Sequence, residues 1–449
     1  MNTTNQSTSS ITYEQNNLQT RYKYWDKMDI EVSATESYGD LPMESLFSVA
    51  LRVNKKRQFL FVSKLIAKHL AVHPSIALGT GSLLASLLME KAGLQPIPQH
   101  KKIVEMIESG KACLETSHET LAYRTALPDK TVFIGMAETA TGLGHSVFHH
   151  FDEAAYIHTT REEIIGASPA FVFEEEHSHA TSHKVYAPAG MLEEADTIIL
   201  IDDEISTGNT LVNLITALDS QFPGKKYLSL SILDWRSEGQ KRKLEDMAAA
   251  RNLTVDVLSL LKGGFDLKHS ESPGETEIAE LKGSGQKTPG RSMQVQAIEL
   301  QSVTGQRYLP FTGRFGLSSS SHSEIGRWAE QLAKTVPASK KPLVIGVGEN
   351  MYLPLRFALA LGGDASVQTT TRSPIFAAEE DGYPIKEKVR FKLPDTDDVN
   401  QFLYNISRID ADRIYLLAES VADEASWQPL ISYLEKKAPV EWLVLTDKK

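Results

Sequence analysis

The sequence predicts an α/β fold, in which an open parallel sheet carries helices on both faces and a second, smaller α/β domain follows. Three observations lead to this prediction. Over residues 28–266, short runs that are almost wholly apolar alternate with helical patterns, as they do in buried parallel sheets. The segment Leu267–Arg291 is rich in glycine, proline and charge, which is typical of a linker. The same alternation then resumes up to the C-terminus.

Apolar runs before the linker predict the strands of the first sheet. These runs are Thr131–Gly135, Ala154–His158, Thr197–Ile201, Tyr227–Leu233 and Val255–Leu261. Apolar residues at helical spacing predict helices at Gln58–His69, Gly81–Ala92, Thr210–Leu218 and Gly239–Arg251. Strands that are separated by helices pair in parallel, because each helix returns the chain to the edge where the previous strand began.

The pattern after the linker predicts a second sheet. Its strands are expected at Pro342–Val347, Ala365–Gln368, Arg413–Leu417 and Glu441–Thr446. Its helices are expected at Ser323–Thr335, Leu353–Leu361 and Ser426–Lys437. The first residues are rich in Asn, Gln, Ser and Thr and can bury little. We therefore expect a disordered tail (1–27), a first domain (28–266), a linker (267–291) and a smaller α/β domain (292–449).

Composition narrows the class of protein. The 449 residues include 47 Lys and Arg against 58 Asp and Glu, a net charge of −11, which disfavours binding to nucleic acid or to a membrane surface. The single cysteine, Cys113, excludes a disulfide framework and any multi-cysteine metal site. We find neither a signal peptide nor an apolar run long enough to cross a membrane, so we expect a soluble cytoplasmic protein.

The most informative segment is Thr197–Thr210, with the sequence TIILIDDEISTGNT. An apolar strand ends in two adjacent carboxylates, Asp202 and Asp203, at the edge where open α/β sheets bind ligands. Small and hydroxyl-bearing residues, 206–210, then lead into a helix whose free N–H groups attract an anion. Together these features describe a pocket for a sugar phosphate. The alternative is a plain turn with Asp and Ser as helix caps, which explains the acidic pair poorly.

This segment resembles the binding motif for phosphoribosyl pyrophosphate (PRPP) of the type I phosphoribosyltransferases. In that motif, apolar residues precede an acidic pair and a Ser/Thr-Thr-Gly-x-Thr turn. The resemblance implies the fold of that superfamily, and it implies that Asp202 and Asp203 hold the ribose 2′- and 3′-hydroxyls. The residues implied to bind the 5′-phosphate are Ser206, Thr207, Gly208, Asn209 and Thr210.

The resemblance also implies a pyrophosphate loop after the first core strand, often with a non-proline cis peptide bond. The residues that take this place are Ala137, Glu138, Thr139 and Ala140. Glu138 departs from the pattern, because a carboxylate repels pyrophosphate unless Mg²⁺ or a basic group intervenes. The next strand of the family commonly ends in basic residues that contact pyrophosphate, and here Arg161 takes this position. A surface ion pair is the alternative for Arg161.

Members of the superfamily close a long mobile loop over the site, and Phe173–Tyr186 lies in the right interval. Its residues His179, His183 and Lys184 are candidates to supply a proton or to shield the reaction from water. Two alternatives stay open. Zinc could bind the histidines, although their spacing matches no zinc motif, so we assign no metal ligand. The segment could also be a solvated loop without chemistry.

The chain most resembles a bacterial group of two-domain phosphoribosyltransferases with a C-terminal TRSP domain. Three segments carry this resemblance: Arg52–His69, Gly135–Ser146 and Thr371–Pro374, which spells the letters TRSP. Members are associated with tellurite-resistance and stress gene clusters, and are predicted to help make a nucleoside-like metabolite. In the second domain, the candidate site residues are Arg314, Glu349, Arg372 and Ser373. Helix capping in an ordinary core is the alternative for each of them.

The implied reaction transfers a phosphoribosyl group from PRPP to a nitrogen acceptor, with Mg²⁺ bound mainly through PRPP. Members that use purines usually have Asp where this chain has Ser206, so an orotate-like or specialised base is the expected acceptor. A homodimer is the expected assembly. A non-catalytic sensor of PRPP or nucleotides on the same fold is an alternative. A further alternative is release or phosphorolysis of ribose 5-phosphate, with the second domain acting on the product.

Overall fold

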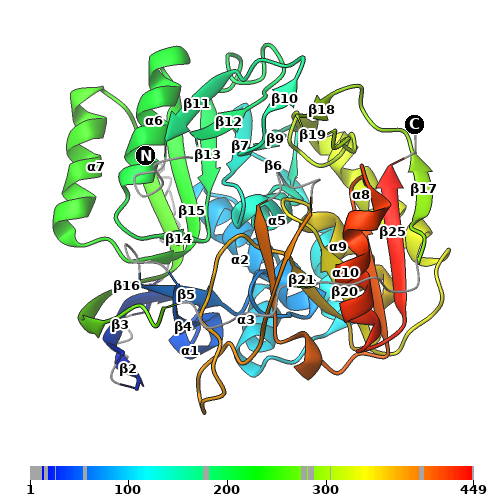
Figure 1. Cartoon of the computed structure of the whole chain (residues 1–449). Coiled ribbons are helices and arrows are strands. Elements are labelled where there is room, and N and C mark those ends of the chain that lie inside the picture. The colour runs from blue at the N-terminus through cyan, green and yellow to red at the C-terminus, as the bar shows by residue number, and fades with distance from the viewer. Residues whose placement is uncertain are drawn as a thin grey trace.

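The computed structural model of the chain describes residues 13–14, 19–25, 27–53, 58–174, 182–274, 281, 288–303, 305–393 and 399–446. These residues form two sheets rich in parallel strands, with helices packed on them, as the sequence predicts (Figure 1). The blue-to-green part of the chain builds the large sheet, and the yellow-to-red part builds the small one. Within the described ranges, no helix is both long and apolar enough to cross a membrane.

The large sheet has a parallel centre. In the described part of the chain, its strands lie in the order β1 (Tyr13–Glu14), β3 (Met28–Tyr38), β16 (Val255–Ser270), β15 (Lys226–Asp234), β13 (Thr197–Ile201), β7 (Thr131–Gly135), β9 (Ala155–His158) and β19 (Leu317–Ser318). The strands from β16 to β9 pair in parallel, and β3 and β19 join antiparallel at the two sides. β2 (Gln19–Tyr24) pairs with β3, and β14 (Glu204–Ile205) pairs with β15. The strands predicted for this sheet are therefore present.

Helices cover both faces of the large sheet. α2 (Pro74–Lys91) and α5 (Ala140–Phe148) lie on one face, and α6 (Asn209–Gln221) and α7 (Glu238–Ala250) lie on the other (Figure 1). Right-handed crossovers explain this, because the chain moves from β7 to β9 in one direction and from β13 to β16 in the other. α2 is buried along nearly its whole length, since it also packs against α3 (His100–Ser109), α4 (Leu114–Ala122) and α5.

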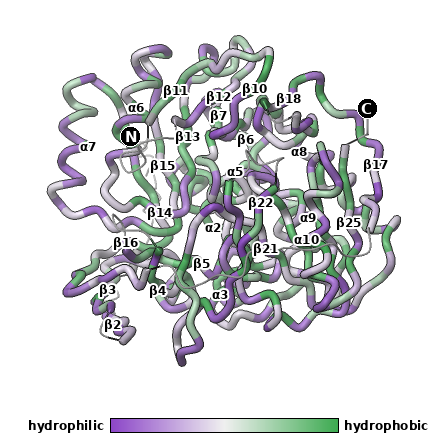
Figure 2. The backbone as a smooth tube through the Cα atoms, in the orientation of Figure 1, coloured by the Kyte–Doolittle hydropathy of each residue, from purple (hydrophilic) through white to green (hydrophobic). Residues whose placement is uncertain are grey.

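The small sheet is parallel throughout its described strands. Their order is β17 (Arg291–Val295), β25 (Val440–Thr446), β24 (Arg413–Ala418), β20 (Pro342–Gly346) and β21 (Ser366–Thr369). Its helices are α8 (Ser319–Ala333), α9 (Tyr352–Leu361) and α10 (Glu424–Glu435). Trp427 of α10 stacks on Trp442 of β25 inside a core of its own. Figure 2 shows apolar stretches in the central strands of both sheets, as buried parallel strands require.

Shorter elements complete the fold. They are α1 (Met43–Leu46), β4 (Phe47–Leu51), β5 (Phe59–Ser63), β6 (Thr125–Ala126), β8 (Phe151–Asp152), β10 (Ile164–Ile165), β11 (Phe171–Glu174), β12 (Ser182–Val185), β18 (Gln301–Ser302), β22 (Lys388–Lys392), β23 (Asn400–Tyr404) and a 3₁₀ turn, Ile406–Arg408. Among these, β4 pairs with β5, β11 with β12, and β22 with β23, each as an antiparallel pair.

The helix predicted at Gln58–His69 is wrong. Phe59–Ser63 is instead strand β5, which pairs with β4 and is buried throughout. The ring of Phe61 lies 4.7 Å from that of Trp235, between ring centroids. A short apolar run fits a buried strand as well as a helix, and here the pairing with β4 and the aromatic contacts decide between them.

The edges of the predicted domains also differ in detail. Most of the expected tail lies outside the described residues, but Gln19–Tyr24 forms β2 and pairs with β3. β16 continues to Ser270 and so enters the segment that the sequence marks as a linker. Residues 275–280 and 282–287, within that linker, lie outside the described residues. The strand continues because its residues 261–270 pair with β3, a partner that lies far away in the sequence.

Beside the separate core around Trp427, a larger apolar core is shared by the two sheets. That core runs from β3 through α2 to α9 of the second sheet. The segment after β5 adds to the edge of the small sheet, where Val72 pairs with Val367 of β21. β19, close to α8, in turn pairs with β9 of the large sheet. The carboxyl ends of strands from both sheets consequently line one pocket between them.

Candidate active site

The turn after β13 lines a small pocket, which we call the β13–α6 pocket. Its polar lining residues are Asp202, Glu204, Ser206, Thr207, Gly208, Thr210 and Ser229. Gly208 precedes the first residue of α6 and has a φ of +80°, a conformation that glycine adopts without strain. The turn therefore places hydroxyl groups and the start of a helix around one small cavity, as an anion site requires.

The acidic residues of this turn divide between the pocket and the sheet. Asp202 and Glu204 both line the pocket, since residues two positions apart on an extended chain point to one side. Asp203 is not among the lining residues, and its carbonyl accepts hydrogen bonds from the N–H groups of Ile232 and Leu233, both at 3.1 Å. The role of Asp203 at the ribose stays a prediction. Glu204 lines the pocket instead, because neighbouring residues of an extended chain point to opposite sides.

The end of β15 supports the turn from outside. Arg236 donates to both oxygens of Asp234, at 2.9 and 2.7 Å, and both side chains are buried. A Cβ atom on Gly208 would lie 2.8 Å from Arg236 Cδ, so the pair leaves room only for glycine. Asn209 does not line the pocket, and its side-chain oxygen accepts from Lys243 Nζ of α7 at 2.6 Å.

The loop after β7 carries the predicted pyrophosphate residues. The peptide bond between Ala137 and Glu138 is cis, as the family resemblance implies. A basic group does lie beside the Glu138 carboxylate, because Lys68 Nζ is 3.4 Å from Glu138 Oε2. The same Nζ donates to the hydroxyl of Thr139 at 2.5 Å. Thr139 directly precedes α5, which begins at Ala140.

A chain of hydrogen bonds joins this loop to Arg161 and to the β11–β12 hairpin. Thr159 Oγ1 accepts from the N–H of Ala137 at 2.8 Å and lies 2.9 Å from His183 Nδ1. Arg161 Nε donates to His183 Nε2 at 3.4 Å, so Nδ1 carries the proton and donates to Thr159. His183 is buried and stacks on Phe173. This geometry suits a positioning residue, and the catalytic role expected of His183 stays a prediction.

Lys184 and His179 are the other two candidates of the predicted mobile loop, and Lys184 lines neither the β13–α6 pocket nor the pocket between the two sheets. Strands β11 and β12 form a hairpin, with Phe173 paired to His183. The backbone of Lys184 exchanges hydrogen bonds with Thr160, and its Nζ lies 4.0 Å from Glu163 Oε2. His179 lies outside the described residues, so its proposed catalytic role stays a prediction.

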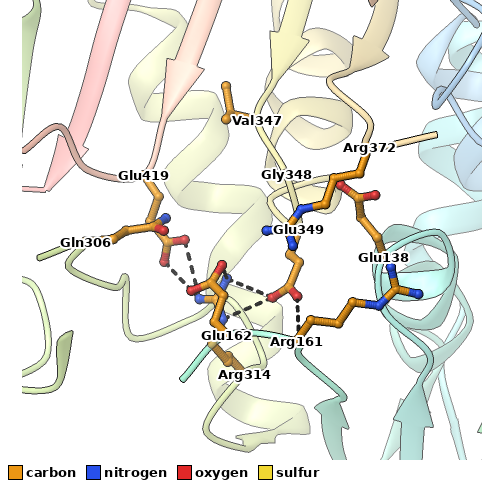
Figure 3. A pocket seen from close by; sticks show the side chains of 10 residues that line it. All are labelled: Glu138, Arg161, Glu162, Gln306, Arg314, Val347, Gly348, Glu349, Arg372 and Glu419. Carbon is orange, nitrogen blue, oxygen red and sulfur yellow. Dashed lines mark hydrogen bonds and ion pairs between the residues drawn. The ribbon is translucent and has the colours of Figure 1, made fainter. Parts of the chain in front are cut away.

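A second pocket lies between the two sheets, and we call it the interdomain pocket (Figure 3). Its lining residues are Glu138, Arg161, Glu162, Gln306, Arg314, Val347, Gly348, Glu349, Arg372 and Glu419. They come from the carboxyl ends of β7 and β9 in the large sheet, and of β20, β21 and β24 in the small one, together with the segment between the sheets. Ligands of parallel sheets bind at such ends.

Arg314 is the centre of charge in this pocket, and Figure 3 shows three carboxylates around it. Its guanidinium nitrogens lie 3.1 Å from Glu349, 3.4 Å from Glu419 and 3.8 Å from Glu162. Arg314 is 1% exposed, so these charges interact with little screening by water. Tyr308 donates to Glu162 at 2.5 Å, and its ring lies 4.3 Å from the Arg314 guanidinium carbon.

Burial raises the pKa of the three glutamates around Arg314, and the charge of Arg314 lowers it. Burial raises the pKa of Glu162 and of Glu419, although Arg314 opposes this rise. Burial acts in the same direction on Glu349, but Arg314 and His158 overcome it and lower the pKa of Glu349. Glu349 is therefore the ionised partner of Arg314 at neutral pH, while Glu162 holds a proton more readily.

Of the four candidate site residues of the second domain, three line the interdomain pocket and one does not. Glu349, Arg372 and Arg314 all line the interdomain pocket. Ser373 does not, because its N–H donates to Thr371 Oγ1 at 3.2 Å and its carbonyl accepts from Tyr404 Oη at 2.5 Å. Ser373 is thus part of the turn that presents Arg372.

Several site residues escape sequence reasoning. Lys68 and Gln306 carry no local signal, since only the fold brings them to the pyrophosphate loop and the interdomain pocket. Glu419 has a signal, because it directly follows the apolar strand β24. Asp234 similarly ends β15 beside Arg236. A charged residue at the carboxyl end of a buried strand is the pattern that identifies such positions.

Both parts of the chain match models of known protein families. Residues 46–264 match a family model described as phosphoribosyl transferase, and residues 311–434 match one described as the TRSP domain C-terminal to it. No curated protein matches the sequence.

Solved structures resemble the chain only distantly. The adenine phosphoribosyl transferase of Trypanosoma brucei is 16% identical, with 33% of this chain and 63% of that chain covered and a TM-score of 0.22. The Leishmania donovani enzyme is 16% identical, with 32% and 64% covered and a TM-score of 0.22. The orotate phosphoribosyltransferase of Mycobacterium tuberculosis H37Rv is 12% identical, with 50% and 92% covered and a TM-score of 0.25. Matches this weak carry no functional argument.

The fold, the turn after β13 and the family match define the class of the protein, which is that of the family described as phosphoribosyl transferase. Within this class, the chain belongs to the family in which a TRSP domain follows the phosphoribosyl transferase domain.

Proposed function

We propose that the chain transfers the 5-phosphoribosyl group of PRPP to a nitrogen acceptor and releases pyrophosphate. The observation that carries this proposal is the β13–α6 pocket, where an acidic strand end and a hydroxyl-rich turn before a helix surround one cavity. A helix start attracts phosphate, and carboxylates accept hydrogen bonds from ribose hydroxyls. Because the pyrophosphate loop adjoins this turn, with Met136 N–H bonded to Ile201 O at 2.9 Å, both ends of PRPP find a partner.

The reaction forms a C1–N bond and breaks the bond from C1 to the pyrophosphate oxygen. The chain contributes mainly by orienting PRPP and stabilising the departing charge. Asp202 and Asp203 orient the ribose, the residues Ser206–Thr210 bind the 5′-phosphate, and Arg161 and the loop Ala137–Ala140 bind pyrophosphate. Support for the position of Arg161 comes from its hydrogen bond to His183, which links it to the loop. The proton of the acceptor nitrogen passes to a base or to water.

Magnesium fits this site as an ion held mainly by PRPP. The described residues contain no group of three or more His, Cys, Asp or Glu side chains that could hold a metal ion by themselves. Asp202 and Glu204 offer carboxylate oxygens in the pocket, which Mg²⁺ favours. When bound, the ion would neutralise charge on the leaving pyrophosphate.

The acceptor belongs to the orotate-like or specialised bases, since Ser206 stands where purine-using members usually carry Asp. We further propose that the product is a nucleoside-like metabolite of stress or tellurite-resistance metabolism, made in the cytoplasm by a homodimer. A sensor of PRPP on the same fold is the second candidate, because Glu349 of the TRSP domain accepts a hydrogen bond from the N–H of Arg161, a proposed pyrophosphate-binding residue.

Isothermal titration of Mg·PRPP into three full-length proteins tests the proposal, with pyrophosphate release assayed in parallel. These are the wild type, the Asp202→Asn/Asp203→Asn double variant and Asp246→Asn, an exposed control on α7. We expect binding by the wild type and the control, and none by the double variant. Binding without release under any acceptor favours the sensor. No binding by the wild type at millimolar PRPP refutes both candidates.

A further inference from the structure

Glu349 follows strand β20 in the TRSP domain, and its carboxylate contacts the turn that carries Arg161. Glu349 Oε1 accepts hydrogen bonds from the hydroxyl of Thr160 at 2.9 Å and from the N–H of Arg161 at 3.4 Å. The oxygen of the same hydroxyl accepts from the N–H of Glu162 at 3.1 Å. The backbone on both sides of Arg161 is therefore tied, directly or through Thr160, to one carboxylate oxygen of the other domain.

The backbone of Glu349 also contacts the end of the pyrophosphate loop. Thr141, in the first turn of α5, has its hydroxyl 3.1 Å from the carbonyl oxygen of Glu349 and 3.1 Å from that of Glu138. A Cβ atom on Gly142 would lie 2.9 Å from Met351 Cβ, so α5 and the segment after Glu349 pack closely. Glu349 thus contacts both the turn and the loop that we propose to bind pyrophosphate.

The Glu349 carboxylate is itself held in place by Arg314. Its Oε2 accepts from Arg314 Nε at 3.2 Å and lies 3.1 Å from Arg314 Nη2. The two side chains are 8% and 1% exposed, so water screens this ion pair little. Arg314 therefore binds one oxygen of the carboxylate, and the other oxygen is directed at the turn. Figure 3 shows Glu349 between Arg314 and Arg161.

We propose that Glu349 is a positioning residue for phosphoribosyl transfer, which holds Arg161 and the pyrophosphate loop in the arrangement that binds the leaving pyrophosphate. This inference rests on the proposed function, and it makes the TRSP domain part of the pyrophosphate site. Glu349 acts through its hydrogen bonds to the turn, because its own carboxylate would repel pyrophosphate. A turn that is held in place before PRPP arrives loses little further freedom on binding, so the affinity for PRPP rises.

Calorimetry on the full-length chain tests this role, with Mg·PRPP as one probe and ribose 5-phosphate, which lacks pyrophosphate, as the other. Glu349→Ala removes the acceptor for the turn, whereas Glu349→Gln keeps an amide oxygen that can accept. Glu419→Ala is the matched control, because it also removes a buried carboxylate from Arg314, but that carboxylate accepts from the N–H of Leu309 instead of the turn. Thr160→Val removes the same hydrogen bond from the opposite domain.

We expect Glu349→Ala and Thr160→Val to bind Mg·PRPP about tenfold or more weakly than the wild type, since each loses a buried hydrogen bond that orders the turn. Glu349→Gln should recover most of the affinity, and Glu419→Ala should bind Mg·PRPP as the wild type does. Ribose 5-phosphate should bind every variant equally, because Glu349 does not line the β13–α6 pocket. A general loss of structure would instead weaken the binding of both probes.

The inference is overturned, and the proposed function is left standing, if Glu349→Ala and Thr160→Val bind Mg·PRPP as tightly as the wild type. It is also overturned if Glu419→Ala weakens binding as much as Glu349→Ala does, or if the affinity of Glu349→Ala for ribose 5-phosphate falls equally. If Glu349→Ala does not fold, the affinity of Thr160→Val for Mg·PRPP decides. Failure of the wild type to bind Mg·PRPP would instead refute the proposed function.

Discussion

Glu349 Oε1 accepts a hydrogen bond from Thr160 Oγ1 at 2.9 Å, and this contact joins the carboxyl end of β20 to that of β9. The same carboxyl group pairs with Arg314 at 3.1 Å. Two sheets that the sequence separates by a linker are thus held together at the edge where each would bind its ligand. The TRSP domain therefore completes the wall of the interdomain pocket.

Arg314 should be the most costly side chain to remove from the interdomain pocket. Arg314→Met leaves Glu162, Glu349 and Glu419 buried without their shared cation. We expect the free energy of unfolding to fall by about 3–5 kcal/mol. Arg413→Met removes a partly exposed pair with Glu441 and should cost less than about 1 kcal/mol. Urea unfolding measures both, and similar losses would contradict the prediction.

Gly208 should be needed for PRPP binding because of its conformation and its neighbour. Gly208→Ala places a Cβ at a φ of +80° and 2.8 Å from Arg236 Cδ, so the turn must move. We expect the affinity for Mg·PRPP to fall by about tenfold or more, with about 1–2 kcal/mol lost in stability. Gly224→Ala is the matched control, since it has the same φ but no atom within 4 Å. It should lose similar stability and keep its affinity; equal affinities of the two variants would refute the role of Arg236.

Lys68 should hold the pyrophosphate loop in place. Lys68→Met leaves Glu138 and Thr139 without the amine that both contact. We expect about 1–3 kcal/mol of lost stability, together with weaker Mg·PRPP binding. Adding Glu138→Gln should restore part of the stability, because the uncompensated charge disappears. Lys64→Met is the control, as its Nζ contacts the carbonyl of Glu44 instead. Additive effects of the two changes in a double-mutant cycle would argue against the pair.

Buried histidines should make the protein sensitive to acid. Burial lowers the pKa of His145 to about 3 and that of His158 to about 4, and lowers the pKa of His322 in the same direction. Below pH of about 6.5, the unfolded chain binds protons that the folded chain refuses, so the free energy of unfolding falls as pH falls. The loss continues until the pH reaches the lowered values.

His322→Phe isolates one contribution to this sensitivity. Both ring nitrogens of His322 lack a partner in the described structure, and the ring packs against His145 and Tyr352. Phenylalanine keeps the ring but cannot bind a proton. Between pH 7 and pH 5, we expect the variant to lose about 2 kcal/mol less stability than the wild type. His118→Gln, at an exposed position, should behave as the wild type does. If the stability of His322→Phe depends on pH as that of the wild type does, buried His322 does not contribute to the acid sensitivity.

Much of the fold is predictable because its signals are local. The strands at Thr131–Gly135 and Thr197–Ile201 have the predicted bounds, since a short apolar run followed by a polar turn identifies a buried parallel strand. The helix after Gly208 is likewise marked by its turn. Phe59–Ser63 shows the limit: its apolar run suits a helix or a strand, and only the partner strand β4 decides between them.

The sequence by itself determined the two-sheet architecture, the β13–α6 turn and the family, because each depends on residues adjacent in the chain. Only the tertiary structure decided which distant groups meet: Lys68 with Glu138, Thr160 with Glu349, and Arg314 with carboxylates from both domains. It also turned His183 inward, against Phe173 and Thr159. The physical reason is that burial, charge pairing and hydrogen bonding act between neighbours in space, and the packing of the two sheets sets those neighbours.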